Sequence, residues 1–362
     1  MSVLTPNQIY GDFRNKRLSR SNASRLLLTL IENIPDLNNK AKILSIKFLG
    51  LITSKEPNVF KLLENLLVSD LNDLIRGNAA KVIISNFPDK AKEPISWILQ
   101  QERPGSCLKL IIKALETVST PKLRSLLKLR DYVNFKGDIY FPSEFCSTFN
   151  LSGKNIDSIK KIDGLDKLTN LRKLYLNFNQ IRKINGLVTL VNLNSLHLQN
   201  NKLSEIKNLD HLGKLKSLQV FDNQISEIDG LEELKDLEIL NLRNNKIEEV
   251  KGLDHIVNLK RLDLSNNQIT DIKGLENLPK LEFLDLSHNH IAEIKGLNHL
   301  RNLKFLDLRN NKITQIESLK ELRKLRCLYL GFNRIKIPCN LELSEHLDIP
   351  DIKNIEESSL NI

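Results

Sequence analysis

Apolar residues in the second half of the chain recur with a period of 22 positions. Leucines and isoleucines fall at fixed distances from one asparagine per period, and most other positions are polar, as the stretch 253–274, LDHIVNLKRLDLSNNQITDIKG, illustrates. The alternation before each asparagine predicts a short β-strand with its leucines inward. Eight such asparagines follow one another without a slip, so we expect eight strands paired in parallel: Asn179, Asn201, Asn223, Asn245, Asn267, Asn289, Asn311 and Asn333.

The asparagine and a later glycine have separate structural roles in each period. A buried amide both donates and accepts hydrogen bonds, so the eight asparagines are expected to form a structural ladder that satisfies the backbone of adjacent turns. A glycine seven positions later permits a positive φ angle. It occurs as Gly186, Gly230, Gly252, Gly274 and Gly296, and Asn208 and Ser318 replace it in two periods.

In the first third of the chain, apolar residues recur at intervals of three and four instead. This spacing predicts amphipathic helices with apolar faces at 26–31, 43–51, 60–67, 75–83, 95–99 and 108–115. Proline-containing breaks at 35, 57, 88 and 104 separate several of them. Successive amphipathic helices bury their faces on one another, so a stacked helical solenoid is expected.

Residues 132–150 differ from both neighbours because the leucine periodicity stops and aromatic residues accumulate: Tyr132, Phe135, Tyr140, Phe141, Phe145 and Phe149. We interpret this segment as an aromatic junction that caps the repeat array, with an aromatic ligand-binding loop as the alternative. A degenerate repeat follows, with Asp157 at the asparagine position. The expected domains are a helical domain at 1–131, the junction at 132–150, the repeats at 151–345, and a C-terminal cap with a frayed tail at 346–362.

The repeat, written LxxLxLxxNxIxxIxGLxxL, is identified as a leucine-rich repeat. Its 22-residue form resembles the subclass typified by the nuclear regulatory subunit of protein phosphatase 1. That resemblance implies a solenoid with a parallel concave sheet, on which the partner usually binds. The C-terminal cap motif frequent in that subunit and its relatives is not found here, which weakens the transfer of its function.

The stretch 62–83, LLENLLVSDLNDLIRGNAAKVI, resembles a HEAT repeat. In that family an aspartate in the turn and an arginine in the second helix pair between layers, and Asp73 and Arg76 are the matching residue types. The expected fold class is therefore an α/β repeat protein. An N-terminal all-α HEAT-like solenoid precedes a leucine-rich repeat solenoid with a parallel concave sheet.

The net charge of +10 lies mostly in the first half of the chain. Residues 1–150 contain 22 Lys and Arg against 14 Asp and Glu, whereas residues 151–362 contain 32 against 30. A diffuse excess of this size favours solubility over nucleic-acid binding. A basic cluster near the N-terminus keeps nucleic acid or an acidic partner as an alternative: Arg14, Lys16, Arg17, Arg20 and Arg25.

The four cysteines, Cys107, Cys146, Cys327 and Cys339, lack the spacing of a zinc site, a redox motif or a disulfide framework. The first residues contain no apolar core of a signal peptide, and no apolar stretch is long enough to span a bilayer. We therefore expect a cytoplasmic protein that does not associate with membranes and is monomeric on its own.

Candidate partner-binding residues lie at the strand positions between the inward leucines. Asp263, Asp285 and Asp307 share one column, in which like charges repel one another unless Arg243, Arg261 and Arg309 neutralise them. Apolar side chains beside them suggest a protein interface. The full candidate set is Tyr175, Phe221, Ile239, Arg243, Arg261, Asp263, Phe283, Asp285, Phe305, Asp307, Arg309 and Tyr329.

The sequence contains no phosphate loop, nucleophile elbow, zinc-protease or kinase motif. We therefore expect no catalytic residue, cofactor or metal. The leading hypothesis is a non-catalytic protein–protein interaction scaffold that binds a protein partner on the concave face of the repeats. The alternatives are a regulatory subunit of a phosphatase or small GTPase, by family analogy, and nucleic-acid binding through the basic N-terminal half.

Overall fold

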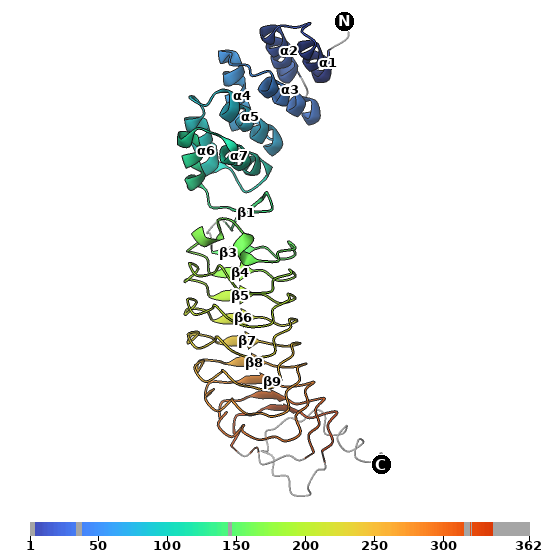
Figure 1. Ribbon diagram of the computed structural model, residues 1–362, viewed down its shortest axis with the longest axis vertical. Coiled ribbons are helices and arrows are strands. Elements are labelled where there is room, and N and C mark those ends of the chain that lie inside the picture. The colour runs from blue at the N-terminus through green and yellow to red at the C-terminus, as the bar shows by residue number, and fades with distance from the viewer. Residues whose placement is uncertain (1–3, 34–37, 144–146, 315–318, 320, 336–362) are drawn as a thin grey trace. The chain divides into compact units, whose positions relative to one another are not determined.

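The computed structural model describes residues 4–33, 38–143, 147–314, 319 and 321–335. The chain divides into two compact units, Met1–Asp131 and Tyr132–Ile362, here called the helical unit and the repeat unit. A helical region followed by a parallel-sheet solenoid confirms the predicted fold class (Figure 1). Ser318 and the predicted tail at 346–362 lie outside the described residues.

The helices of the helical unit follow the predicted apolar faces. Asn72 begins α5 by accepting hydrogen bonds from Leu74 N and Ile75 N, and Pro57 occupies the first turn of α4, where it displaces no helical hydrogen bond. The elements are α1 (Pro6–Arg14), α2 (Arg20–Asn33), α3 (Asn39–Leu51), α4 (Pro57–Ser69), α5 (Asp73–Asn86), α6 (Lys92–Gln101), α7 (Ser106–Thr117), α8 (Pro121–Arg124) and the 3₁₀ helix η1 (Ser125–Leu129).

Helices α3, α5 and α7 pack side by side in one row, and α4 packs against α5 and α6 in a second row (Figure 1). Two glycines allow the close approach within the first row. A Cβ at Gly50 would lie 3.0 Å from Val82 Cγ2, and one at Gly77 would lie 2.8 Å from Leu110 Cδ1. These contacts fix the lengthwise register of α3 against α5 and of α5 against α7.

Polar contacts link successive layers of the helical unit, but Asp73 and Arg76 do not form the expected pair with each other. Arg76 donates two hydrogen bonds to Glu102, at 2.7 and 2.8 Å, and Asp73 Oδ2 accepts one from Ser106 N at 3.0 Å. Both side chains thus reach the following layer, each through its own partner.

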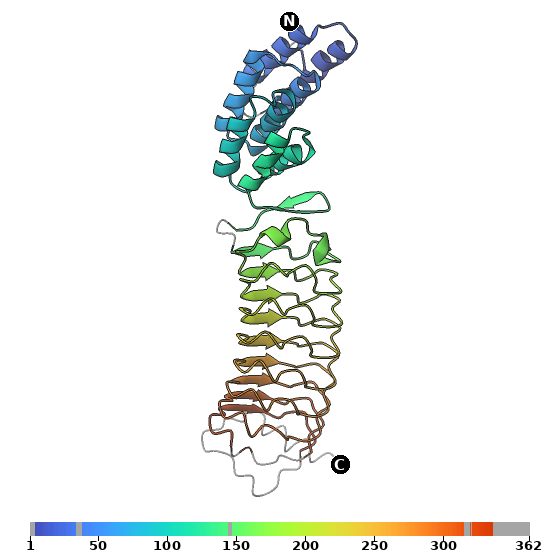
Figure 2. The same cartoon turned by 60° about the vertical axis from the view of Figure 1, so that its left-hand side comes forward.

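The repeat unit contains a parallel sheet of nine strands in chain order (Figure 2). From β4 onward each residue of a strand pairs with the residue 22 positions later in the next strand. Every column of the repeat is therefore continuous. The strands are β3 (Thr148–Asn150), β4 (Lys173–Tyr175), β5 (Ser195–His197), β6 (Ser217–Gln219), β7 (Ile239–Asn241), β8 (Arg261–Asp263), β9 (Phe283–Asp285), β10 (Phe305–Asp307) and β11 (Cys327–Tyr329).

The sheet has one strand more than the eight expected, because β3 comes from the aromatic segment 132–150. In this segment β1 (Val133–Phe135) and β2 (Asp138–Tyr140) form a hairpin, and Asn134 pairs with Asp163 of the next coil. Phe135 and Phe149 join the apolar core of the repeat unit. The segment therefore covers the first coil.

The assignment of Asp157 to the asparagine position is wrong. β3 pairs with β4 at a separation of 25 residues rather than 22, so the first coil is three residues longer than the others. Asn179 Oδ1 accepts from Lys154 N and Ile156 N, whereas the Asp157 side chain is exposed and pairs with Lys161.

The asparagine ladder runs through the interior of the coils, and Asn267 illustrates its bonding. Its amide nitrogen donates to Leu242 O and Leu264 O at 3.0 Å, and its Oδ1 accepts from Ile247 N at 3.1 Å. Leu242 O also accepts from Asn245, so each such carbonyl is shared by two asparagines. The ladder therefore connects every coil to the next.

A second ladder, of alternating charge, lies at the residue just before each of the strands β6 to β10. Glu238 pairs with Lys216 at 3.5 Å and with Lys260 at 2.8 Å, and Glu282 pairs with Lys304 at 2.8 Å. These contacts lower the pKa of the Glu238 carboxyl, chiefly through its hydrogen bond from Lys260. We call Lys216, Glu238, Lys260, Glu282 and Lys304 the charge ladder; its charges are paired with one another.

Within the described residues, none of the helices has the length and apolarity needed to cross a bilayer.

Candidate functional site

The outward positions of the repeat sheet form continuous columns, because the strand register is unbroken from β4 to β11. Phe283 pairs with Phe305, which pairs with Cys327 in the first column. Asp263, Asp285, Asp307 and Tyr329 occupy adjacent strands in the second column. The structure thus places most of the predicted site on β7 to β11.

Three aromatic rings, Phe283, Phe305 and Tyr329, contact one another in succession and form what we call the aromatic row: the first two are stacked and the third is tilted by 46° against the second. The rings of Phe283 and Phe305 are 4.4 Å apart and nearly parallel, and those of Phe305 and Tyr329 are 5.3 Å apart. Arg261 Cζ lies 4.2 Å from the centre of Phe283, and Arg309 Cζ lies 4.8 Å from that of Tyr329. Cation–π attraction therefore holds both ends of the row, and the rings are half-buried with fixed orientations.

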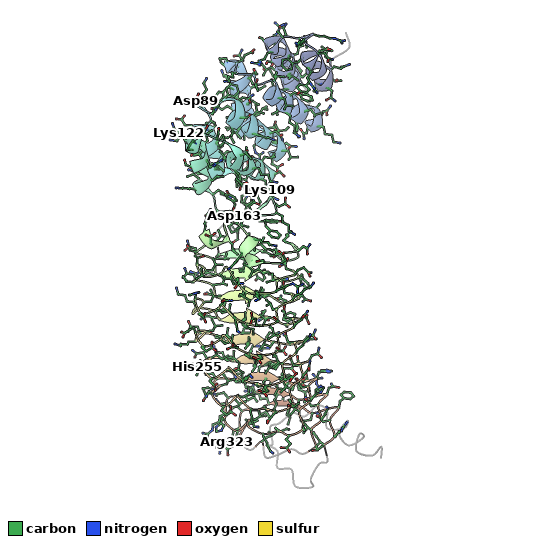
Figure 3. The ribbon with its side chains drawn as sticks, in the orientation of Figure 1. Asp89, Lys109, Lys122, Asp163, His255 and Arg323 are labelled. Carbon is green, nitrogen blue, oxygen red and sulfur yellow. The ribbon has the colours of Figure 1, made fainter. Side chains whose placement is uncertain are left out.

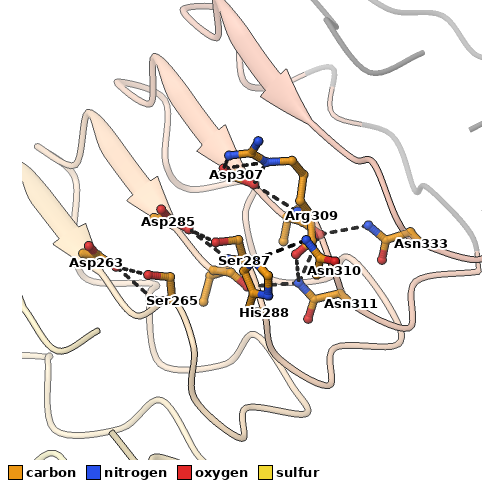
Figure 4. Close-up of polar contacts among 12 residues, drawn as sticks. Asp263, Ser265, Asp285, Ser287, His288, Asp307, Arg309, Asn310, Asn311 and Asn333 are labelled. Carbon is orange, nitrogen blue, oxygen red and sulfur yellow. Dashed lines mark hydrogen bonds and ion pairs between the residues drawn. The ribbon is translucent and has the colours of Figure 1, made fainter. Parts of the chain in front are cut away.

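The three aspartates of the neighbouring column differ in their surroundings (Figure 4). Asp263 Oδ1 accepts from Ser265 Oγ, and Asp285 Oδ1 from Ser287 Oγ, each at 2.6 Å. Asp307 is only 1% exposed and accepts two hydrogen bonds from Arg309 Nε at 3.0 Å. Both carboxylate oxygens of Asp307 thus bond to an arginine, whereas the hydrogen bonds to Asp263 and Asp285 come from neutral serines.

Only one of the three arginines expected to neutralise this column does so directly. Arg309 pairs with Asp307, whereas Arg261 lies on the ring of Phe283. Burial accordingly raises the pKa of the Asp285 carboxyl, and the charges of Asp263 and Asp307 add to this effect against the hydrogen bonds from Ser287. The carboxylate of Asp285 therefore weakens the folded state at neutral pH.

Replacing Asp285 by Asn is expected to raise the free energy of unfolding at pH 7. A carboxyl whose pKa is raised on folding stabilises the folded state only when protonated, below its unfolded pKa of about 3.9, and this contribution is lost as the pH rises through the folded pKa. The difference between variant and parent should consequently shrink as the pH falls from 7 towards 4. Urea unfolding at several pH values measures it; a difference that grows on acidification would contradict the assignment.

The other predicted residues lie further along the same sheet face. Ile239 lies on β7 and Arg243 just after it, whereas Phe221 follows β6. Tyr175 lies on β4, three strands before β7. Its ring stacks on that of His197, with the two ring centres 4.3 Å apart. Burial, followed by the charge of Lys173, lowers the pKa of His197. His197 was not among the predicted residues, although its position in the column of Tyr175 was a usable signal.

In the described part of the chain, no three His, Cys, Asp or Glu side chains are grouped so that they could hold a metal ion. His288 contacts Asn310 at 3.3 Å, and His290 contacts its neighbour Asn289. The polar groups around the aspartate column are hydrogen-bonded to one another, and the arrangement presents a surface of fixed rings and charges.

Four consecutive segments, 169–211, 213–255, 257–299 and 301–344, match a family model described as Leucine Rich repeats (2 copies). The coils of this part of the chain are therefore leucine-rich repeats, which confirms that identification. The match does not distinguish the phosphatase-subunit subclass, and no enzyme family is indicated. The HEAT-like character of the helical unit stays a prediction.

Solved leucine-rich repeat structures resemble the chain at the level of the repeat. A leucine-rich repeat protein of Leptospira interrogans is 26% identical with a TM-score of 0.45, over 52% of this chain and 56% of that one. An internalin C2 of Listeria monocytogenes is 27% identical with a TM-score of 0.46, over 56% of this chain and 86% of that one. This chain thus spans little more than half of the Leptospira structure. No curated protein matches the sequence.

Proposed function

We propose that the protein is a non-catalytic interaction module that binds a protein partner on the concave face of the repeat sheet, the face opposite the inward leucines, across β7 to β11. The observation that supports this proposal is the aromatic row, stacked on the solvent side of the sheet and held at both ends by arginines. The apolar core of the repeat unit is built from the inward leucines and isoleucines. The core therefore does not require these rings.

Fixed aromatic side chains are suited to anchor a partner. Aromatic residues and arginine dominate the binding energy of protein interfaces, and an anchor that is already ordered loses little conformational entropy on binding. Phe305 lies between Phe283, on which it stacks, and the tilted ring of Tyr329. The aromatic row therefore offers apolar contact area to a partner with little loss of side-chain conformational entropy on binding.

The charges beside the row supply orientation. Among the described residues, the second carboxylate oxygen, Oδ2, of Asp263 and Asp285 has no bonded partner, whereas both oxygens of Asp307 are held by Arg309. Arg243, two residues after the end of β7, is exposed. A partner with basic groups opposite Asp263 and Asp285 would be aligned along the strands by charge complementarity.

The combined replacement Phe283→Ala, Phe305→Ala and Asp285→Lys is expected to reduce partner recovery by about fiftyfold, since it removes two anchors and reverses a charge. The full chain serves as bait in native cell extract, with crosslinking and quantitative mass spectrometry. The thermal melt should stay intact, because all three side chains lie outside the apolar core.

A control places two apolar-to-alanine truncations and the same aspartate-to-lysine reversal outside the sheet. Val188 and Val257 are 55% and 43% exposed, and Asp236 is also exposed. The variant Val188→Ala, Val257→Ala and Asp236→Lys should recover the same partner as the parent protein. Equal recovery by the sheet-face variant and this control would exclude the sheet face as the binding site.

A further inference from the structure

The helical unit carries a second surface, on the row formed by α3, α5 and α7. Because α4 packs against α5 from the other row, the outward sides of the three helices form one face. The exposed residues of α3 alternate between lysine and leucine at helical spacing: Lys40, Leu44, Lys47 and Leu51. On α5 the exposed positions include Leu74 and Lys81, and on α7 they include Lys113 and Lys109. Figure 3 labels Lys109 on this helix.

Three of these lysines lie level with one another across the three helices. The contact of Gly50 with Val82 and the hydrogen bonds of Asn86 with Leu49 O and Gly50 O set α3 against α5, and they bring Lys47 level with Lys81. The contact of Gly77 with Leu110 sets α5 against α7 and brings Lys81 level with Lys113. Packed helices lie about 8–10 Å apart, so Lys47, Lys81 and Lys113, the lysine row, form a line of charges at about that spacing.

This face has almost no negative charge of its own. The three helices, which the structure describes completely, contribute two carboxylates, Asp73 and Glu116. Asp73 is engaged by Ser106 N, and Glu116 is half-buried at the end of α7. The side chains of Lys47, Lys81 and Lys113 therefore repel one another and would gain from an anionic partner.

Aliphatic side chains lie among the lysines. Leu51 is 61% exposed, Leu74 42% and Leu44 36%. Single-stranded nucleic acid is held by lysines or arginines together with aromatic rings on which bases stack, and the exposed positions of these helices carry no aromatic ring. Leucine side chains gain instead from apolar groups of a protein. The combination fits a segment that carries both carboxylates and aliphatic side chains.

We propose that the outward face of α3, α5 and α7 is a docking surface for an acidic segment of a partner protein, with its carboxylates opposite the lysine row and its aliphatic side chains against Leu44, Leu51 and Leu74. This site is independent of the repeat-sheet interface. Two separate surfaces make the protein an adaptor that joins one protein to another.

Fluorescence anisotropy of a labelled synthetic 20-residue peptide of Glu and Leu, arranged at helical spacing, tests the proposal on the full chain. The peptide should bind, and Lys47→Glu, Lys81→Glu and Lys113→Glu together should weaken binding by about tenfold or more through charge repulsion. A matched control reverses three exposed lysines elsewhere in the helical unit, Lys61, Lys92 and Lys122. It has the same net charge and should change binding less than about twofold.

Two further probes separate the chemical classes of ligand. Single-stranded oligothymidine and vesicles of phosphatidylserine and phosphatidylcholine should bind equally to the row variant and to the control. The proposal would be overturned if both variants weakened binding of the peptide equally. It would also be overturned if the lysine row affected binding of only the oligonucleotide or the vesicles. A milder variant, in which the same three lysines are replaced by Gln, should also weaken binding of the peptide. It tests the proposal if the Glu variant has a lowered melting temperature.

Discussion

Replacement of Asn267 by Ala is expected to lower the free energy of unfolding of the repeat unit by about 2–5 kcal/mol. Ile247 N would lose its hydrogen-bond acceptor in a buried position, and two carbonyls would each lose one of two donors. Leu242 O and Leu264 O keep their bonds from Asn245 and Asn289, so the loss is largest at the amide of Ile247.

Urea unfolding followed by circular dichroism measures this change. Asn277→Ala is the matched control, because Asn277 is exposed and its amide bonds only to Asp254 in the neighbouring coil. This variant should stay within about 0.5 kcal/mol of the parent protein. Similar losses from the two variants would show that the ladder amides are no more important than surface amides.

The variant Gly274→Ala is expected to lower the free energy of unfolding by about 2–4 kcal/mol. Gly274 has a φ of +86°, and a Cβ there would lie 2.0 Å from the backbone oxygen of Val250. The obstacle is backbone of the preceding coil, so it cannot move aside as a side chain would. Thermal and urea unfolding of the full chain give the difference.

Two comparisons make this expectation specific. Gly213→Ala should be neutral or slightly stabilising, because its nearest neighbour would be 3.8 Å away and its φ is not positive. Gly274→Asn should cost less than Gly274→Ala, because Asn208 occupies the equivalent position with a φ of +64° and donates to Ile184 O at 3.0 Å. If alanine at 274 were tolerated as well as alanine at 213, the glycine requirement would be wrong.

The repeat architecture could be predicted from sequence because eight copies of one pattern point to the same solution. Each asparagine, leucine and glycine position is sampled repeatedly, and physical chemistry allows one common arrangement. The pattern failed where a copy differed in length. The first coil is longer by three residues, and the signal for this was the pair Leu151 and Ile156, which are buried 25 residues before Leu176 and Ile181.

The candidate site was less predictable, because the position of a side chain in the repeat does not determine which of several neighbours it contacts. Asp263 and Asp307 share a column, but the residue two positions later is Ser265 in one case and Arg309 in the other, and only the second aspartate becomes buried and paired. Arg261 was expected to neutralise an aspartate, but it lies on the ring of Phe283. The lysine row also needed the register between helices, which the glycine contacts supplied.

The charge ladder has a consequence for how identical coils find their correct neighbours during folding. Its signs alternate from coil to coil, so the charge pattern repeats only every second coil, whereas the hydrogen bonds and leucines repeat every coil. If one coil looped out and β7 paired with β9, the backbone would fit, but Glu238 would face Glu282; for β8 with β10, Lys260 would face Lys304. Like charges directly opposite one another disfavour such pairings. The ladder therefore distinguishes odd from even coils, and it opposes the deletion of a single coil from an otherwise uniform stack.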